Sequence, residues 1–132
     1  MNKRAEGNAG EIAAAVYLEQ HGVRIIDKNY RFHKLGEIDL IGEGESSMQF
    51  SSNEKGVGVR TLIFVEVKKR SGLDRGYAAQ AVDSRKQRQI CRVAGAYLME
   101  HPECANMMIR FDVIAIDGDE LTWIQNAFEY HI

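Results

Sequence analysis

Two short runs of the sequence place acidic residues among large apolar ones. In GEIDLI, residues 36–41, Asp39 lies between isoleucine and leucine, and in FVEVKKR, residues 64–70, Glu66 lies between two valines. An ionised carboxylate at the edge of an apolar core is costly unless a partner or a cation compensates it. Magnesium prefers hard oxygen ligands and is commonly held by one or two carboxylates together with substrate phosphate oxygens. The two runs therefore indicate a divalent-cation site that could act on phosphates.

The alternation of side chains along a β-strand decides which residues of the first run share a face. Glu37 and Asp39 are expected on one side of this strand, and Ile38 and Leu40 on the other. Because Glu37 shares the face of Asp39, it could assist at the same site.

The second run adds a lysine to the acidic residue. Phe64, Glu66 and Lys68 are expected on one face of their strand, so two neighbouring strands can bring Asp39, Glu66 and Lys68 together. The alternative is that Glu66 and Lys68 form cross-strand ion pairs on a half-exposed sheet. The residues themselves leave both interpretations open.

Two helices and five strands are predicted to position these residues. No internal repeat or linker interrupts the chain, so we predict one α/β domain over residues 1–132, with a mixed central sheet of about five strands flanked by helices. Residues 42–60 contain four glycines and four serines, which predicts a flexible insert. The expected order is α-β-β-β-α-β-β, with helices at 7–20 and 78–100 and strands at 23–32, 36–41, 61–70, 110–116 and 121–124.

Glu11 lies on the first predicted helix, in a row with Ala15 and Leu18 that is expected to face the sheet. Its carboxylate would then point inward, toward the strands. The alternative is a glutamate placed near the helix start because the macrodipole favours negative charge there.

The second predicted helix carries a dense set of polar and basic residues. Its apolar stripe puts Lys86 and Gln87 on the side facing the sheet, where they could reach a phosphate, and leaves an outer row formed by Arg85, Arg88 and Arg92. This outer row is either a solvated face or a set of contacts to a nucleic-acid backbone, which position the nucleic acid without reading its sequence.

Composition supports these assignments. The chain has 132 residues, 45% apolar content and no apolar run of membrane-spanning length, and its first residues do not form a signal peptide, so a cytoplasmic protein without a membrane partner is expected. Cys91 and Cys104 lack metal-ligand spacing. The net charge is −2, yet between Lys68 and Arg92 there are eight basic and two acidic residues. This local excess of positive charge predicts a nucleic-acid partner.

A series of short motifs follows one another along the chain. They are Gly7, Gly10 and Glu11 near the start, YLEQHG, Asn29 to Arg31, GEIDLI, FVEVKKR, SRKQR, RFDVIAI and Trp123 to Phe128. Together and in this order, these motifs resemble the YraN-like family of bacterial proteins. That family is related in fold to archaeal Holliday-junction resolvases and to the PD-(D/E)XK nuclease superfamily, so the resemblance implies a restriction-endonuclease-like core.

The resemblance also implies roles for individual residues. Asp39 and Glu66 would be ligands of Mg²⁺ or Mn²⁺, with the carbonyl of Val67 as a further ligand. Lys68 would be the catalytic lysine, and Glu11 the acidic residue of the first helix. We predict nucleic-acid contacts from Lys69, Arg70, Arg85, Lys86, Gln87 and Arg88.

Three functions follow from these residues. The first is a metal-dependent endonuclease that hydrolyses phosphodiester bonds in structured or branched DNA. The second is a nucleic-acid-binding module that has the nuclease fold without appreciable cleavage, and the third is a protein-interaction domain. Cutting two symmetric strands would need a homodimer, formed through the fifth strand or the 42–60 segment.

Overall fold

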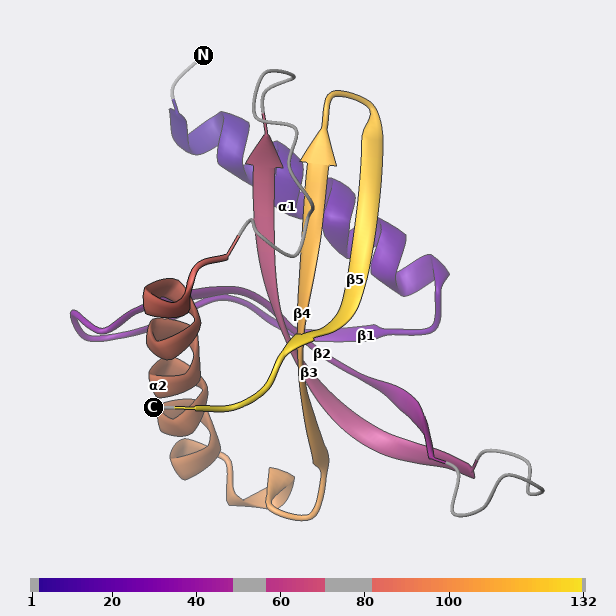
Figure 1. Cartoon of the computed structure of the whole chain (residues 1–132), viewed down its shortest axis with the longest axis vertical. Helices are drawn as coiled ribbons and strands as arrows, with labels where there is room; N and C mark the ends of the chain where they lie inside the picture. Colours follow the sequence, from indigo (N-terminus) through magenta and orange to yellow (C-terminus); the bar gives the residue numbers. More distant parts are fainter. Residues whose placement is uncertain (1–2, 49–56, 71–81, 132) are drawn as a thin grey trace.

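A five-stranded mixed sheet forms the centre of the molecule (Figure 1). The computed structural model describes residues 3–48, 57–70 and 82–131. The strand order is β1-β2-β3-β4-β5; β3 and β4 are parallel, and all other neighbours are antiparallel. The elements are α1 (Lys3–Gln20), β1 (Arg24–Phe32), β2 (Gly36–Met48), β3 (Val57–Arg70), α2 (Ser84–Glu100), the short 3₁₀ helix η2 (Pro102–Cys104), β4 (Met108–Asp117) and β5 (Glu120–Phe128).

The predicted α/β class and element order are confirmed, and the architecture is consistent with a restriction-endonuclease-like core. The parallel pairing of β3 with β4 requires a crossover connection, and α2 lies in that connection. In Figure 1, β3 to β5 pass in front of α1, whereas α2 lies apart from α1 and close to the C-terminus. None of the helices in the described part of the chain is long and apolar enough to cross a membrane.

The two helices cover opposite faces of the sheet, and alternate side chains of β3 therefore pack against different helices. Phe64 belongs to an apolar cluster that includes Ile90 of α2, whereas its neighbour Val65 packs with Leu18 of α1. The next residues continue this alternation, which places Glu66 on the α2 face and Val67 on the α1 face. The sheet therefore presents the acidic residue of β3 to α2, as its sequence spacing predicts.

The alternation along β2 is interrupted at Asp39. Ile38 packs in the α2-side cluster and Leu40 in the α1-side cluster, so the prediction that these two residues share a face is wrong. The ladder between β2 and β3 begins at Leu40, and the preceding residues of β2 pair with β1. The pleat breaks where β2 leaves β3; on β1, Asn29 has a φ of 53° at the same level.

The predicted flexible insert at 42–60 is in large part strand. β2 continues to Met48 and β3 begins at Val57, and the residues between them lie outside the described part of the chain. Glycine content misled the prediction because Gly42 has a packing role. A Cβ at this position would lie 2.5 Å from Cγ1 of Val23, so only glycine lets the segment after α1 pack this closely on β2.

The second helix begins later than predicted. Its first residue is Ser84, and the carboxylate of Asp83 caps it by accepting a hydrogen bond of 2.8 Å from the backbone N–H of Lys86. Val82 is not helical, and residues 78–81 of the predicted helix lie outside the described residues.

A buried ion pair ties β2, β4 and β5 together on the α1 face. Arg110 donates two hydrogen bonds of 2.8 Å to the carboxylate of Asp112 and a third to the hydroxyl of Ser46. The same carboxylate accepts hydrogen bonds from the Trp123 indole and from the backbone N–H of Asn126. Asp112 is only 1% exposed, so every one of these bonds replaces contact with water.

Candidate metal centre

Asp39 lies where β2 separates from β3. The last ladder pair before this point is Leu40 with Val65, so the next N–H groups of β3 that point toward β2 lose their strand partner. Oδ2 of Asp39 accepts a hydrogen bond of 2.8 Å from the backbone N–H of Val67. The Asp39 carboxylate thus replaces a backbone carbonyl of β2 as the acceptor for this N–H, and the hydrogen bond fixes the carboxylate at the end of the β2–β3 ladder.

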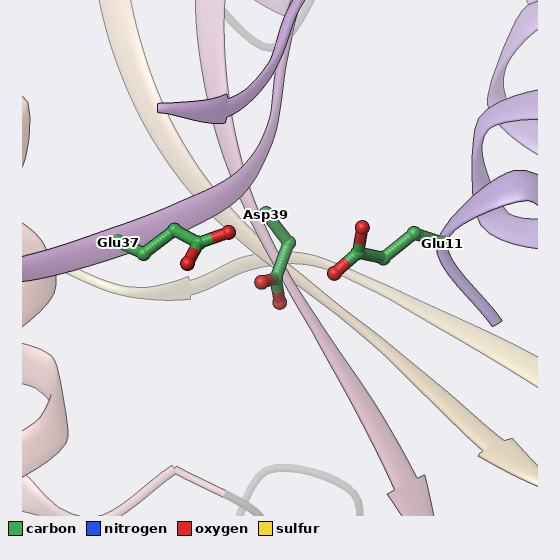
Figure 2. A group of neighbouring side chains, drawn as sticks. All are labelled: Glu11, Glu37 and Asp39. Atoms are coloured by element: carbon green, nitrogen blue, oxygen red, sulfur yellow. The ribbon is translucent and has the colours of Figure 1, made fainter. Parts of the chain in front are cut away.

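Two further carboxylates flank Asp39. Figure 2 shows Glu11 and Glu37 pointing toward Asp39 from opposite sides, one from α1 and the other from β2. One oxygen from each of the three carboxylates lies within 4.8 Å of the others. Glu11 points inward because Leu18, two turns further along α1, is buried against the sheet. The side chain of Asn29 lies close enough to Glu11 to lower the pKa of that carboxyl, against the larger effect of burial.

Glu66 approaches the same place from the α2 face of β3. Its side chain is 12% exposed, and Oε1 lies 3.7 Å from Nζ of Lys86 on α2. Within the described part of the chain, Oε2 of Glu66 is the one buried side-chain oxygen or nitrogen without a hydrogen-bond partner. Lys68, exposed on the same face, is close enough to lower the pKa of Glu66. We refer to Glu11, Glu37, Asp39 and Glu66 as the acidic cluster.

Burial and mutual repulsion raise the pKa values of Asp39, Glu66 and Glu11. Burial raises the pKa of Asp39 from its ordinary value of 3.8 to about 6, and the charges of Glu11 and Glu37 add to the rise, against the hydrogen bond from Val67. Burial and the charge of Asp39 raise the pKa of Glu66 from 4.5 to about 7, although Lys86 opposes this. The pKa of Glu11 is also raised, mainly by burial. Asp39 and Glu66 therefore bind protons near neutral pH, as residues of sites that bind cations or transfer protons often do.

Comparison with known proteins shows the family of this chain. A sequence model described as "Uncharacterised protein family UPF0102" matches residues 10–116. The chain belongs to the UPF0102 family. It is 39% identical over 136 residues to a UPF0102 protein of Acetivibrio thermocellus, covering 96% of this chain and 93% of the relative. A UPF0102 protein of Lachnoclostridium phytofermentans is 36% identical over 129 residues, covering 98% and 97% of the two chains.

UPF0102 membership agrees with the predicted YraN-like family and covers the whole candidate site. A third relative, UPF0102 protein VP0448 of Vibrio parahaemolyticus, is 39% identical over 128 residues, which cover 96% of this chain and 93% of the relative. The matched residues 10–116 contain the acidic cluster, Lys68 and all of α2. The site of this UPF0102 chain therefore lies within the part that defines the family.

The stability of this UPF0102 protein without divalent cations should fall as the pH rises. The pKa values of Asp39 and Glu66 are higher in the folded chain than their ordinary values, so the folded state holds protons that the unfolded state releases. The extra stability is present below about pH 4 and is lost as the pH rises through about 7, on the order of 6 kcal/mol for the two carboxyls together. Urea unfolding in EDTA between pH 5 and 8 measures the larger part of this change. A double variant Asp39→Asn, Glu66→Gln should give a flat profile, and a flat profile for the wild type would contradict the assignment.

The structure brings most of the predicted site residues together, but not all. Lys69 follows Lys68 on β3 and therefore points to the α1 face, away from Glu66. The side chain of Arg70 lies outside the described ones. Gln87 donates to the carbonyl of Val82, and its Oε1 lies 3.0 Å from Nε2 of His131, so its amide is already engaged within the chain.

The predicted basic row on α2 lines a groove of about 640 Å³ beside the acidic cluster. Lys86 belongs to both, because it lines the groove and lies 3.7 Å from Glu66. Among the described residues that line the groove, the one carboxylate is that of Asp83, which caps the helix. We call this surface the basic groove; it is lined by Lys34, Leu35, Asp83, Arg85, Lys86, Arg88, Gln89 and Arg92.

Sequence reasoning gave no definite role to two residues that lie at this site. Glu37 was expected only to assist Asp39 from the same face of the strand, and its carboxylate is one of the three that lie within 4.8 Å of one another. Asn29 was part of a motif without a role, and its side chain lies close enough to Glu11 to lower the pKa of that carboxyl. Asn29 has a left-handed φ of 53°, a conformation that asparagine tolerates better than most residues. An asparagine within a predicted strand was the sequence signal for this irregular position.

Proposed function

We propose that this UPF0102 protein is a metal-dependent endonuclease that hydrolyses phosphodiester bonds in structured or branched DNA. The observation that carries the proposal is the burial of Asp39 and Glu66 together at the end of the β2–β3 ladder, close enough for the charge of one to raise the pKa of the other. A site that only bound phosphate would need no such carboxylates and would be opposed by them. Their presence supports chemistry that uses a cation.

The residues of the acidic cluster fit a hard divalent cation. All four offer carboxylate oxygens, which are the ligands that Mg²⁺ and Mn²⁺ prefer. Oε2 of Glu66 is buried and has no hydrogen-bond partner among the described residues. A bound cation would provide the missing partner for this oxygen. The raised pKa values of Asp39 and Glu66 show that burial and neighbouring carboxylates disfavour their negative charges. A bound cation would relieve both effects.

In this proposal Asp39 and Glu66 hold the cation. The carbonyl of Val67 is a candidate third ligand because the N–H of the same strand residue already contacts Asp39, and the N–H and C=O of one strand residue point to the same side. Glu11 and Glu37 flank the site and add negative charge. A bound Mg²⁺ or Mn²⁺ supplies the positive charge that polarises a phosphoryl oxygen and provides a nucleophile at neutral pH.

The two lysines act on the phosphate in this proposal. Lys68 shares a face of β3 with Glu66, from where its ammonium group orients the attacking water and offsets negative charge that develops on the phosphoryl oxygens. Lys86 lies 3.7 Å from Glu66 and is 41% exposed, so it can turn from the carboxylate to a phosphate in the basic groove.

The same arrangement supports the proposed relation to the PD-(D/E)XK superfamily and to Holliday-junction resolvases. An aspartate at the end of one strand, an E-x-K sequence on the next, and a glutamate from the first helix are brought to one point by a mixed sheet. Each was predicted from the sequence, and their proximity supports a common site.

The second candidate function is a nucleic-acid-binding module without cleavage. The basic groove favours it, because Arg85, Arg88 and Arg92 provide cations for phosphates without any contribution from the acidic cluster. Such contacts would give strong and salt-dependent binding on their own.

Cleavage of defined DNA substrates separates the two candidates. We expect labelled four-way or flap DNA to be cut with Mg²⁺ or Mn²⁺, not with EDTA, and not by Asp39→Asn, which keeps the size and hydrogen-bonding oxygen of the side chain. The matched control is Asp119→Asn, an exposed acid in the β4–β5 turn, which should cut normally. Tight, salt-dependent binding without cutting would favour the module, and equal cutting by Asp39→Asn would contradict the proposed site.

A further inference from the structure

The basic groove continues into an apolar hollow of about 700 Å³ on α2. Leu35 and Arg92 line both, so the two form one surface that runs away from the acidic cluster along the helix. The hollow is lined by Phe32, Leu35, Arg92, Gly95, Ala96, Met99, Glu100 and Tyr130. In Figure 1 the chain after β5 returns to α2, which brings Tyr130 to this surface.

The apolar hollow exposes side chains that a folded protein usually covers. Met99 is 86% exposed, Tyr130 52% and Leu35 38%. Small residues of α2, Gly95 and Ala96, leave room between them. An aromatic ring, a methionine and a leucine around such a space offer apolar contact to a flat group.

The boundary between groove and hollow is held in place. Nε2 of Gln89 on α2 donates a hydrogen bond of 2.7 Å to the carbonyl of Leu35 in the β1–β2 turn. The next residue, Gly36, has a φ of 138°, and a Cβ there would lie 2.6 Å from the Gln89 amide. The turn is therefore fixed on α2, and the surface needs no rearrangement to receive a ligand.

We propose that an unpaired DNA strand lies along α2, with its phosphates in the basic groove and a base in the apolar hollow. This inference rests on the proposed function and names the part of the substrate that the site holds. The cations Arg85, Arg88 and Arg92 complement phosphates, and a helix rises about 1.5 Å per residue, so the row extends over about 10 Å.

The combination of a charged groove and stacking side chains is what single strands require. Surfaces that bind single strands pair a basic track with aromatic residues on which the bases stack. A duplex keeps its bases stacked inside, so it could use the groove but not the hollow without flipping a base. An apolar protein partner would leave the adjoining cations without counter-charges.

Binding of labelled oligonucleotides in EDTA tests this proposal without any cleavage. We expect a 20-nucleotide dT strand to bind about tenfold more tightly than a duplex of equal length, by fluorescence anisotropy. Tyr130→Ala should weaken single-strand binding about tenfold and leave its salt dependence unchanged, whereas Tyr130→Phe should bind normally. Arg88→Ala should weaken both substrates and reduce the salt dependence. The control is Ile12→Ala, an exposed apolar residue on α1.

The outcomes separate this proposal from the proposed function. Equal or tighter binding of the duplex, tighter binding of a U20 RNA strand, or normal single-strand binding by Tyr130→Ala would each overturn the single-strand site, even if the protein cuts DNA. Selective single-strand binding that depends on Tyr130, in a protein that cuts no DNA with Mg²⁺ or Mn²⁺, would support the single-strand site and contradict the nuclease.

Discussion

Replacing Glu66 by glutamine is expected to abolish cleavage and at the same time to stabilise the metal-free protein. Glutamine has the size of glutamate but no negative charge, so the site loses a cation ligand while its neighbours stay in place. We expect the rate of DNA cleavage with Mg²⁺ to fall on the order of 1000-fold or more. Initial rates on a substrate that the wild type cuts measure this loss.

The stabilising effect has an electrostatic cause. Burial and the charge of Asp39 together raise the pKa of Glu66 to about 7. At pH 8 the wild type therefore holds Glu66 ionised in an unfavourable site. Removing that charge should increase the free energy of unfolding on the order of 2 kcal/mol at pH 8 and much less at pH 5, where Glu66 is protonated. Urea unfolding in EDTA at the two pH values measures the difference.

The sign of this effect distinguishes a cation site from a structural ion pair. If the role of Glu66 were to pair with Lys86, the glutamine variant would lose that attraction and be less stable at pH 8. Glu37→Gln provides a matched control, since the same substitution is made at a side chain that is 33% exposed. Its effect on stability should be smaller than that of Glu66→Gln.

Replacing Asp112 by alanine is expected to destabilise the protein by about 3–5 kcal/mol. The substitution leaves Arg110, which is 9% exposed, as a buried charge without its counter-ion, and it removes the acceptor for Trp123 and Asn126. Urea unfolding at pH 7 measures the loss. The proposed metal site should keep its chemistry in the fraction that remains folded, because Asp112 does not belong to the acidic cluster.

Two controls make the Asp112 result specific. Asp119→Ala changes the same residue type at an exposed position of the β4–β5 turn and should alter stability by less than about 0.5 kcal/mol. The double variant Arg110→Met, Asp112→Asn should recover part of the stability, since no charge stays buried and asparagine keeps the size of aspartate and an acceptor oxygen for Trp123 and Asn126. A loss below about 1 kcal/mol for Asp112→Ala would show that the ion pair does not hold the strands together.

The sequence predicted those features that depend on local periodicity. Alternation along β3 was enough to place Phe64, Glu66 and Lys68 on one face, since this central strand has regular ladders on both sides. Helical spacing likewise put Glu11 on the side of α1 that faces the sheet. These residues lie in regular elements, where the period of the backbone decides the direction of a side chain.

The sequence could not predict features that arise where strands separate or where distant segments meet. Ile38 and Leu40 were assigned to one face because nothing in GEIDLI signals that β2 leaves β3 at Asp39. Gln87 was expected to reach a phosphate, but the C-terminal His131 lies at its amide. Gly42 suggested a mobile connection, and its actual reason is the proximity of Val23. Each of these depends on tertiary contacts.

Calorimetric titration of Mn²⁺ into the protein without DNA tests most directly whether Asp39 and Glu66 coordinate the same cation. At pH 6.5 the wild type should bind Mn²⁺ and release protons, because its carboxylates are partly protonated before the cation arrives. Asp39→Asn and Glu66→Gln should each lose at least about tenfold in affinity, and much of the proton release. Wild-type protein that binds no Mn²⁺, or variants that bind it as tightly as the wild type, would contradict the account.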